Sequence, residues 1–390
     1  MNEVLILSAA RTPIGKLMGA LASMPAPKLG AVAIEAAIRR AGIDAGIIDD
    51  VLMGEVITAG VGQAPARQAA LFAGLPRSVP ATSINKVCGS GLRAVMLAAQ
   101  AIRAGDASVI VAGGMESMSN APHLANLREG TRFGDISLRD ANFHDGLLDP
   151  FEHWAMGDAA EFIADEWSIT REAMDRFALT SHQKAIAAMD AGRFDAEIVP
   201  VLMNGRTVDR DEAPRRDTSL DALARLKPAF KPDGKVTAGN APGLNDGAAA
   251  LVVTSREAAM QLGKRPLARI VGYTQAAVEP RQIFIAPAQA ISRLLQCVGW
   301  SMREVDLIEL NEAFAAQVLA DGSALAQDGW DWNRVNVNGG AIALGHPIGA
   351  SGARILVTLI HALHERRLQR GIAALCLGGG EAVAMAIECA

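Results

Sequence analysis

The 390-residue chain has few cysteines, few aromatic residues and no block of basic residues. Its four cysteines, at positions 88, 297, 376 and 389, form neither a CxxC pair nor a Cys/His metal spacing. This excludes a disulfide scaffold and favours a reducing compartment. The net charge is −5 with lysine and arginine scattered, so we expect no nucleic-acid partner. The glycine pairs at 113–114 and 339–340 lack the spacing of a phosphate loop, and we expect neither a metal ion nor a cofactor.

The chain also lacks a long uninterrupted apolar run. Its most apolar stretch, 371–390, is interrupted by three consecutive glycines from Gly378 and by Glu381 and Glu388. This pattern predicts two buried strands joined by a glycine turn and argues against a membrane span. The first residues lead directly into a predicted strand at 4–7, so no signal peptide is expected. We therefore expect a cytoplasmic protein with no membrane partner.

What the chain has in abundance is small apolar residues. Hydrophobic residues make up 50% of it, with alanine, glycine and valine dominant, which suits tightly packed α/β layers. Up to residue 117, strands alternate with helices, which predicts an α/β sheet covered by helices. From 119 to about 244, polar residues and a long helix at 170–191 indicate an inserted, loop-rich segment, after which the alternation resumes. The strands expected first are 4–7, 50–54 and 109–112, and the helices are 28–41, 64–73 and 92–104.

The two α/β parts repeat one pattern. The first copy has the turn 85–91, a helix, and a strand from 109 that ends in glycines. The second has the turn 345–352, a helix from about residue 351, and the strand 373–377 before three glycines. Duplicated units place corresponding turns at equivalent positions, so we expect these turns to converge on one cleft. Three reactive residues lie in them: Cys88, His346 and Cys376.

Cys88 lies in a Gly/Ser-rich turn directly before a predicted helix. Gly89 or Ser90 is expected to begin that helix. The unpaired N–H groups and the dipole at a helix N-terminus favour an anion, so we expect the pKa of this thiol to fall. A thiol in this setting is a candidate nucleophile. A lone free cysteine is more often a small buried apolar residue, so the assignment depends on partners elsewhere in the chain.

Three further residues are candidate partners. His346 lies in a glycine-bounded turn that corresponds to the turn of Cys88, where an imidazole would take the thiol proton. Cys376 ends an apolar strand before three glycines, whose N–H groups are free to face a ligand. Asn311 directly follows the predicted strand 307–310, and its amide would hold a water or an oxygen. The ordinary alternatives are a structural histidine, a buried strand cysteine, and a helix N-cap for Asn311.

The motifs resemble those of the thiolase family over essentially the whole chain. The form of the turn around Cys88 is most similar to that of the biosynthetic branch, the acetyl-CoA acetyltransferases. The resemblance implies two duplicated βαβαβαββ halves, with helices sandwiched between two mixed sheets, plus an inserted loop domain. It assigns 1–117 and 244–268 to the N-terminal half, 118–243 to the inserted domain, and 269–390 to the C-terminal half. The matching segments are 85–91, 236–240, 244–249, 311–315, 335–352 and 376–380.

By this resemblance the protein is an acyltransferase that acts on CoA thioesters by a ping-pong mechanism. Cys88 would attack the acyl carbonyl and hold the acyl group, and His346 would activate it. Cys376 would act as the acid/base, removing the α-proton of acetyl-CoA in Claisen condensation or protonating the carbanion in thiolysis. Asn311, through a water, and His346 would form one oxyanion hole. The backbone N–H groups of Cys88 and Gly378 would form the other.

Several positions depart from the family pattern around the expected CoA and acyl pocket. A histidine that helps to wall this pocket is replaced by Ala155, and a serine that contacts the pantetheine is replaced by Pro242. A Met-Gly pair becomes Ile283 and Phe284, which adds a large side chain. Arg215 matches a basic residue that packs on the adenine, although an arginine in a charged loop is ordinarily solvated. The residues that the resemblance assigns to substrate binding are Met156, Arg215, Ala241, Pro242, Ile283 and Phe284.

The reaction that the resemblance implies is the conversion of two acetyl-CoA molecules to acetoacetyl-CoA and CoA. A degradative 3-ketoacyl-CoA thiolase for longer or functionalised chains shares the mechanism and is the first alternative. A non-catalytic acyl-CoA-binding relative is the second. The expected partners are acetyl-CoA, acyl-CoA and CoA, as substrates or products and not as cofactors. The resemblance also implies a homotetramer, a dimer of dimers, with the insertion contributing to assembly and to CoA binding.

Overall fold

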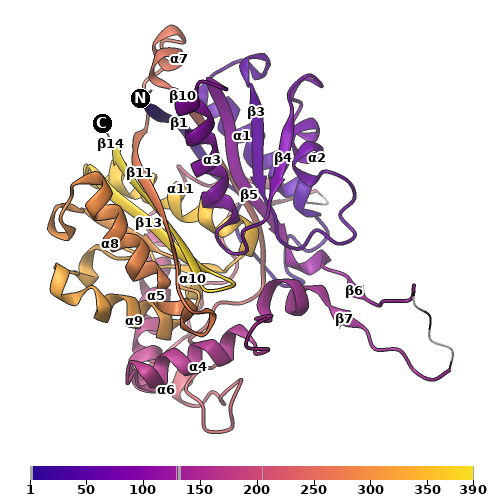
Figure 1. Ribbon diagram of the computed structural model, residues 1–390, viewed down its shortest axis with the longest axis vertical. Coiled ribbons are helices and arrows are strands. Elements are labelled where there is room, and N and C mark those ends of the chain that lie inside the picture. Colours follow the sequence, from indigo (N-terminus) through magenta and orange to yellow (C-terminus); the bar gives the residue numbers. More distant parts are fainter. Residues whose placement is uncertain (1–2, 129, 131–132, 204, 390) are drawn as a thin grey trace.

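The computed structural model describes residues 3–128, 130, 133–203 and 205–389. Among them, ten strands form one mixed sheet, and two short hairpins lie apart from it (Figure 1). The order across the sheet is β12-β13-β14-β11-β1-β10-β5-β3-β4, with β2 paired to β10. The ten strands are β1 (Val4–Arg11), β2 (Gly15–Lys16), β3 (Asp50–Gly54), β4 (Ala81–Ile84), β5 (Val109–Ser117), β10 (Asn245–Ser255), β11 (Ala268–Ala277), β12 (Leu307–Leu310), β13 (Arg370–Leu377) and β14 (Glu381–Cys389).

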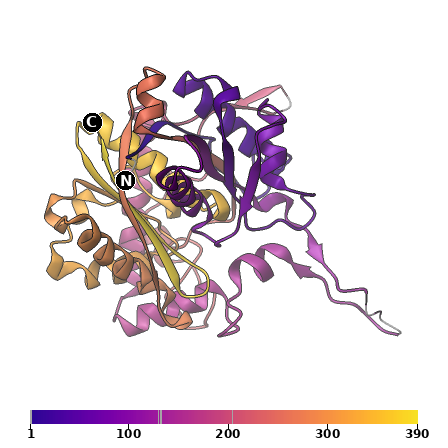
Figure 2. The same cartoon turned by 45° about the horizontal axis from the view of Figure 1, so that its top comes forward.

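Helices cover both outer faces of the sheet and also fill the space between its two parts. α1 packs on β1, β5 and β10, α2 on β3 and β4, and α8 on β11, β13 and β14. α3 and α11 pack on each other and on strands of both parts, so they form a central helical layer (Figure 2). The bounds of these helices are α1 (Ala26–Ala41), α2 (Pro65–Phe72), α3 (Ser90–Ala104), α8 (Ala286–Val298) and α11 (Ile348–Arg366).

The two expected sheets are joined into one. The strands β4, β3, β5, β10 and β1 belong to the first part, and β11, β14, β13 and β12 belong to the second. They meet only where β1 pairs with β11, through Leu5 with Arg269 and Ile6 with Ala268. A strand at the edge of a sheet exposes unpaired N–H and C=O groups, and this short antiparallel pairing satisfies some of them. The helical layer between the parts is as expected.

The predicted elements are confirmed, with differences at their ends. β3 and β12 have the expected bounds, while β1 and β5 continue beyond them to Arg11 and Ser117. The apolar stretch near the C-terminus forms β13 and β14 with a glycine turn between them, and Ala390 lies outside the described residues. α11 was expected to begin near Ser351, but it begins at Ile348. Pro347 immediately precedes it with φ −68°, a value fixed by its ring that suits entry into a helix.

The close approach of α3 and α11 depends on two glycines, one in each copy of the repeat. A Cβ atom at Gly91 would lie 2.7 Å from the backbone nitrogen of Ala353. A Cβ atom at Gly352 would lie 2.5 Å from the backbone nitrogen of Leu92. Real Cβ atoms do not come so near, so only glycine permits this packing. Because Cys88 and His346 lie just before these helices, the same contact brings their turns together.

The segment 118–243 adds helices and two hairpins around the sheet. The strands β6 and β7 lead into a long arm that projects away from the body (Figures 1 and 2). Exposed apolar side chains on this arm are those of Leu127, Phe133, Ile136 and Leu138.

None of the described helices combines the length and apolar character that crossing a bilayer requires. The elements of this segment are β6 (His123–Leu124), β7 (Arg139–Asp140), α4 (Met156–Glu166), α5 (Arg171–Asp190), β8 (Val201–Met203), β9 (Arg206–Val208) and α6 (Leu220–Ala224). The other α-helices among the described residues are α7 (Arg256–Gln261), α9 (Ala315–Ala324) and α10 (Ala341–Leu344).

A fully buried ion cluster connects β1 to the segment 118–243. The guanidinium of Arg11 donates to Glu197 through Nε at 2.6 Å, and to both carboxylate oxygens of Asp211 at 2.7 and 2.8 Å. Burial alone would lower the pKa of Arg11, but the two carboxylates raise it above its ordinary value. A buried charge is tolerated only with such pairing, because the interior does not solvate ions.

We expect Arg11→Met to lower the free energy of unfolding by about 3–5 kcal/mol, since two carboxylates would then be buried without a counter-charge. Urea denaturation followed by circular dichroism measures this. Arg39→Met is the matched control, because the Arg39 ion pair with Glu35 is exposed on α1; it should change the stability by less than about 1 kcal/mol. Equal effects of the two substitutions would contradict the importance of the buried cluster.

Candidate active site

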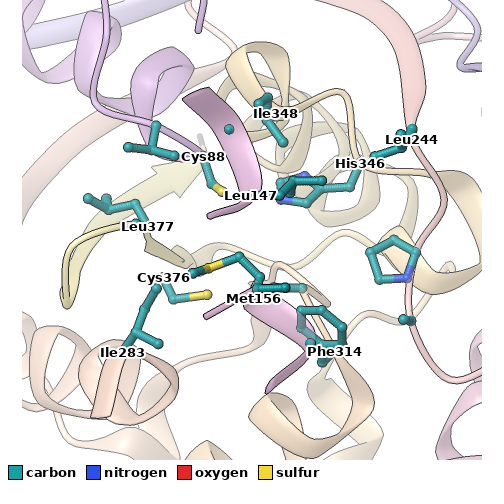
Figure 3. Close-up of a pocket in the computed structure, with 18 of the residues that line it drawn as sticks. Cys88, Leu147, Met156, Leu244, Ile283, Phe314, His346, Ile348, Cys376 and Leu377 are labelled. Atoms are coloured by element: carbon teal, nitrogen blue, oxygen red, sulfur yellow. The ribbon is translucent and has the colours of Figure 1, made fainter. Parts of the chain in front are cut away.

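The structure brings Cys88, His346 and Cys376 to the wall of one cavity of about 390 Å³ (Figure 3). Cys88 comes from the loop before α3, His346 from the loop before α11, and Cys376 from the end of β13. The expected convergence of the two repeat turns is thus confirmed. The rest of the wall is almost entirely apolar, which gives the three reactive groups a dry environment. Other residues lining the cavity are Leu147, Met156, Leu244, Phe314, Ile348 and Leu377.

The backbone around Cys88 is held in an uncommon conformation. Val87 has φ +44°, which a β-branched residue rarely adopts. The Val87 N–H donates to Asn85 Oδ1 at 3.0 Å, and its carbonyl accepts from the backbone N–H and the hydroxyl of Ser90 at 3.0 and 2.6 Å. Ser90 begins α3, and its hydroxyl oxygen also accepts from the Lys86 N–H at 2.8 Å. These bonds hold the strained turn that presents Cys88 to the cavity.

The expected fall in the pKa of Cys88 is wrong in direction. Burial raises the pKa of its thiol to about 12, and the negative charge of Glu116 adds to this. The backbone N–H groups of Cys88 and Gly378 face the sulfur and act in the opposite direction. The helix N-terminus is present as expected, but desolvation outweighs its effect. Cys88 is therefore a thiol at rest and needs a base to become a nucleophile.

His346 is placed to be that base. Its Nδ1 lies 2.6 Å from the hydroxyl oxygen of Ser351, whose O–H donates to the Pro347 carbonyl at 2.9 Å. Because that hydroxyl proton is engaged, Ser351 accepts from His346 Nδ1–H, which leaves Nε2 unprotonated. The His346 backbone N–H also donates to Asn245 Oδ1 at 2.9 Å. Burial, with the positive charge of Arg354, lowers the pKa of His346 to about 3, so the ring is neutral.

Asn311 and Cys376 lie close to these two groups. Asn311 is fully buried after β12, and its Nδ2 is 3.5 Å from His346 Nε2. α9 begins at Ala315, so the alternative that Asn311 caps a helix is wrong. Its side chain contacts His346 instead of forming part of the cavity wall. The pKa of Cys376 is raised well above its ordinary value by burial and by the nearby Cys88.

Most of the expected substrate-binding residues line the cavity, and one does not. Met156, Ala241, Pro242, Ile283 and Phe284 form part of its wall, as does Ala155. Phe284 is 2% exposed, and its ring centroid lies 5.4 Å from that of Phe314, so the two rings pack as one apolar surface. Arg215 is exposed and outside the wall, where its backbone N–H donates to His182 Nδ1 at 3.1 Å. Its contact with the adenine stays a prediction.

Two family models together match nearly the whole chain. The model described as "Thiolase, N-terminal domain" matches residues 4–257, and "Thiolase, C-terminal domain" matches residues 264–389. The chain belongs to the thiolase family. The resemblance drawn from its motifs is thus confirmed.

Relatives of this thiolase match it from end to end. It is 55% identical over 394 residues to an acetyl-CoA acetyltransferase of Cupriavidus necator, with 100% of both chains covered. It is 53% identical to an acetyl-CoA acetyltransferase of Pseudomonas aeruginosa, with 99% of both chains covered. The crystal structure of the Bacillus anthracis acetyl-CoA acetyltransferase superposes on it with a TM-score of 0.97 at 45% identity, covering 100% of this chain and 99% of that one. The expected thiolase fold is thereby confirmed.

The sequence reasoning missed several residues of this site. Ser351, which contacts Nδ1 of His346, lies five residues after it in the first turn of α11, and the serine in this Gly/Ser-rich stretch was a signal present in the sequence. Leu147 and Phe314 were missed because nothing local marks a residue that reaches a distant cavity. Among the described residues, no group of three or more histidines, cysteines or carboxylates is arranged to hold a metal ion.

Ser351→Ala is expected to slow the alkylation of Cys88 by iodoacetamide about tenfold. Removing the hydrogen-bond partner that orients a functional histidine typically lowers activity by at least that factor. Without the hydroxyl, the ring is free to turn and its Nε2 no longer faces the thiol. Peptide mapping by mass spectrometry reads the adduct on Cys88. The control is Ser323→Ala on α9, whose exposed hydroxyl donates only to the Leu319 carbonyl. A rate for the Ser351 variant equal to that of this control would contradict the orienting role.

Proposed function

We propose that this thiolase condenses two acetyl-CoA molecules reversibly to acetoacetyl-CoA and CoA, through an acetyl group on Cys88. The observation that carries the proposal is the meeting of two uncharged thiols with a neutral imidazole in one apolar cavity. The full-length relatives are named acetyl-CoA acetyltransferases, which supports acetyl as the transferred group. A carbon–carbon bond beside a thioester requires an acyl carrier and a separate base, and two thiols divide these tasks.

In the first half-reaction, His346 Nε2 takes the proton of Cys88, and the sulfur attacks the carbonyl carbon of acetyl-CoA. The negative oxygen of the tetrahedral intermediate lies at the backbone N–H groups of Cys88 and Gly378, which already face the Cys88 sulfur. The C–S bond to CoA then breaks. Cys376 gives its proton to the departing CoA sulfur, which leaves acetyl-Cys88, an imidazolium and a Cys376 thiolate as a neutral whole.

In the second half-reaction, the Cys376 thiolate removes the α-proton of another acetyl-CoA. His346 and Asn311, the latter through a water, stabilise the enolate oxygen, which the contact between these two side chains supports. The enolate carbon attacks the acetyl group, and the bond to Cys88 breaks. The Cys88 sulfur recovers its proton from His346, so every group returns to its starting form. The same steps in reverse are thiolysis.

Coenzyme A enters this scheme as substrate and product, and we propose no separate cofactor. The nucleophile and the two bases are side chains of the chain itself, which supports this. Free cysteines at all four positions agree with a cytoplasmic location. We infer that residues 1–117 together with 244–268 form one half and that residues 269–390 form the other. The position of β10 between β1 and β5 in the sheet supports the assignment of 244–268 to the first half.

We further infer a homotetramer, a dimer of dimers, in which the inserted domain 118–243 contributes to assembly and to CoA binding. The arm formed around β6 and β7 supports this, because it carries exposed Leu127, Ile136 and Leu138 away from the body. Such side chains gather where another molecule covers them. Arg215 belongs to the same domain, and its proposed contact is with the adenine of CoA.

The division of labour between the thiols is tested by incubating the protein with acetyl-CoA and measuring intact mass. Cys88→Ala is expected to abolish the acetyl adduct, because the acyl carrier is gone. Cys376→Ala is expected still to form the adduct, more slowly because the departing CoA sulfur must then take its proton from His346 or water, and to lower condensation at least about a thousandfold, since the base is lost. An adduct that survives in the Cys88 variant, or normal condensation by the Cys376 variant, would refute the assignment.

Phe284→Ala is expected to raise kcat/KM for thiolysis of 3-ketohexanoyl-CoA relative to acetoacetyl-CoA by about tenfold or more, as two extra methylenes gain room. The reason is that the Phe284 ring closes one side of the cavity against Phe314. Phe72→Ala, on the surface of α2, removes an equal side chain and serves as the control. An unchanged ratio would show that Phe284 does not limit the acyl chain. A wild-type preference for the longer substrate would favour the degradative alternative.

A further inference from the structure

Two buried carboxylic acids lie near Cys88, and the reaction steps above use neither. Glu55 is 1% exposed after β3, and Glu116 is fully buried in β5. The Glu116 carboxylate accepts three backbone N–H groups: Oε2 from Val56 at 3.1 Å and from Gly349 at 2.9 Å, and Oε1 from Ile57 at 3.2 Å. Neither oxygen of Glu55 has a hydrogen-bond partner among the described residues. The two acids are therefore held very differently.

These contacts decide which of the two acids keeps its proton. Burial raises the pKa of Glu55 to about 8, and the charge of Glu116 adds to this. Burial also raises the pKa of Glu116 to about 7, but its three N–H donors favour the ionised form. The other charged or titratable groups that act on Glu116 or feel its charge are Asp246 on β10 and Cys88 before α3. The three donors thus favour the ionised form of Glu116, whereas Glu55 has no donor that would favour its ionised form.

The N–H groups that Glu116 holds belong to the wall behind Cys88. Val56, Ile57 and Ile348 form an apolar cluster with Met118 and Ala141, and Cys88 packs against this cluster. Two of the three N–H donors are Val56 and Ile57 themselves, and the third follows Ile348. Figure 3 shows Ile348 beside both Cys88 and His346. The carboxylate is therefore bonded to the backbone of the surface that supports the nucleophile.

Glu116 also joins the two halves of the repeat at this point. Gly349 lies in the first turn of α11, two residues before the serine that orients His346. A Cβ atom at Gly349 would lie 2.8 Å from Glu116 Oε2 and 2.7 Å from the Met115 carbonyl oxygen, so only glycine allows this approach. Val56 and Ile57 belong to the first half, and Gly349 belongs to the second. One side chain thus fixes both halves where their reactive residues meet.

We propose that Glu116 is a positioning residue for the acyl transfer: its carboxylate holds the loop after β3 and the first turn of α11 where they set Cys88 opposite His346. Its negative charge has a second effect, because it disfavours the thiolate form of Cys88. The positioning role rests on the proposed function, because it is measured as a rate of acetyl transfer. The effect of the charge does not rest on it, because it is measured on the Cys88 thiol alone.

The test compares Glu116→Gln with Glu55→Gln in the full-length protein. Iodoacetamide alkylation of Cys88 is followed by peptide mass mapping, with the exposed Cys297 as an internal reference. Glu116→Gln is expected to speed alkylation of Cys88 relative to Cys297 about threefold, because a pKa lower by one unit raises the thiolate fraction about tenfold but also makes the thiolate less nucleophilic. It is also expected to slow acetyl transfer from acetyl-CoA about tenfold or more, because an amide nitrogen replaces one acceptor and the wall shifts. Glu55→Gln replaces a neutral acid by a neutral amide and should leave both rates within about twofold.

Glu116→Asp separates charge from position. It keeps the negative charge but is too short to hold all three N–H groups, so alkylation of Cys88 and acetyl transfer should both fall. Unchanged alkylation and unchanged transfer in Glu116→Gln would overturn the proposal, as would equal effects of the Glu55 and Glu116 variants. If Glu116→Gln does not fold, Glu116→Asp alone tests both parts of the proposal. Alkylation of Cys88 faster than in the wild type would then overturn the effect of the charge. Acetyl transfer at the wild-type rate would overturn the positioning role. A wild-type protein that forms no acetyl adduct would refute the proposed function while leaving the alkylation result intact.

Discussion

The site depends on one packing contact, the close approach of α3 and α11 between the two halves. Each helix presents a glycine where the other's backbone passes, and no larger residue fits at either place. Both helices are preceded by the turn that carries a reactive residue, Cys88 in one copy and His346 in the other. The distance between helices therefore sets the distance between nucleophile and base. A second consequence is burial, because the packed helices and the mostly apolar cavity wall cover the reactive groups.

Burial determines the resting protonation state of the two thiols and the imidazole. Burial raises the pKa of Cys88 and Cys376 and lowers that of His346, so all three rest uncharged. Charge then forms only in pairs, when a proton moves from a thiol to the imidazole, and the ion pair is held by the low dielectric. The same environment strengthens the N–H groups that face the developing oxyanion.

The repeat in the sequence was enough to predict which residues meet. Cys88, His346 and Cys376 occupy corresponding turns and strand ends, and duplicated units fold alike. Quantities that depend on burial were not predictable in this way. The pKa of Cys88 was expected to fall because a helix begins at Ser90, and the helix is present, but the extent of desolvation is a property of the assembled core. Likewise Asn311 had a local reason to cap a helix, and only the tertiary structure shows that it contacts His346 instead.

Contacts between distant residues were beyond the reach of sequence patterns. The bond between Glu116 and Gly349 joins residues 233 positions apart, and neither residue has a local feature that marks it. Phe284 was recognisable as a departure from the family, yet its packing on Phe314 depends on how the loop before α8 meets the start of α9. The sequence therefore predicts which groups react more reliably than it predicts what supports them.

A raised pKa at the nucleophile fits the reversible reaction better than a lowered one would. The nucleophilicity of a thiolate falls as its pKa falls, so a strongly acidified Cys88 would attack acetyl-CoA more weakly. A thiolate of high pKa attacks well but leaves poorly, and in the proposed cycle Cys88 must do both. The proton held on His346 in that cycle resolves this conflict, because it is returned to the Cys88 sulfur as the carbon–sulfur bond breaks.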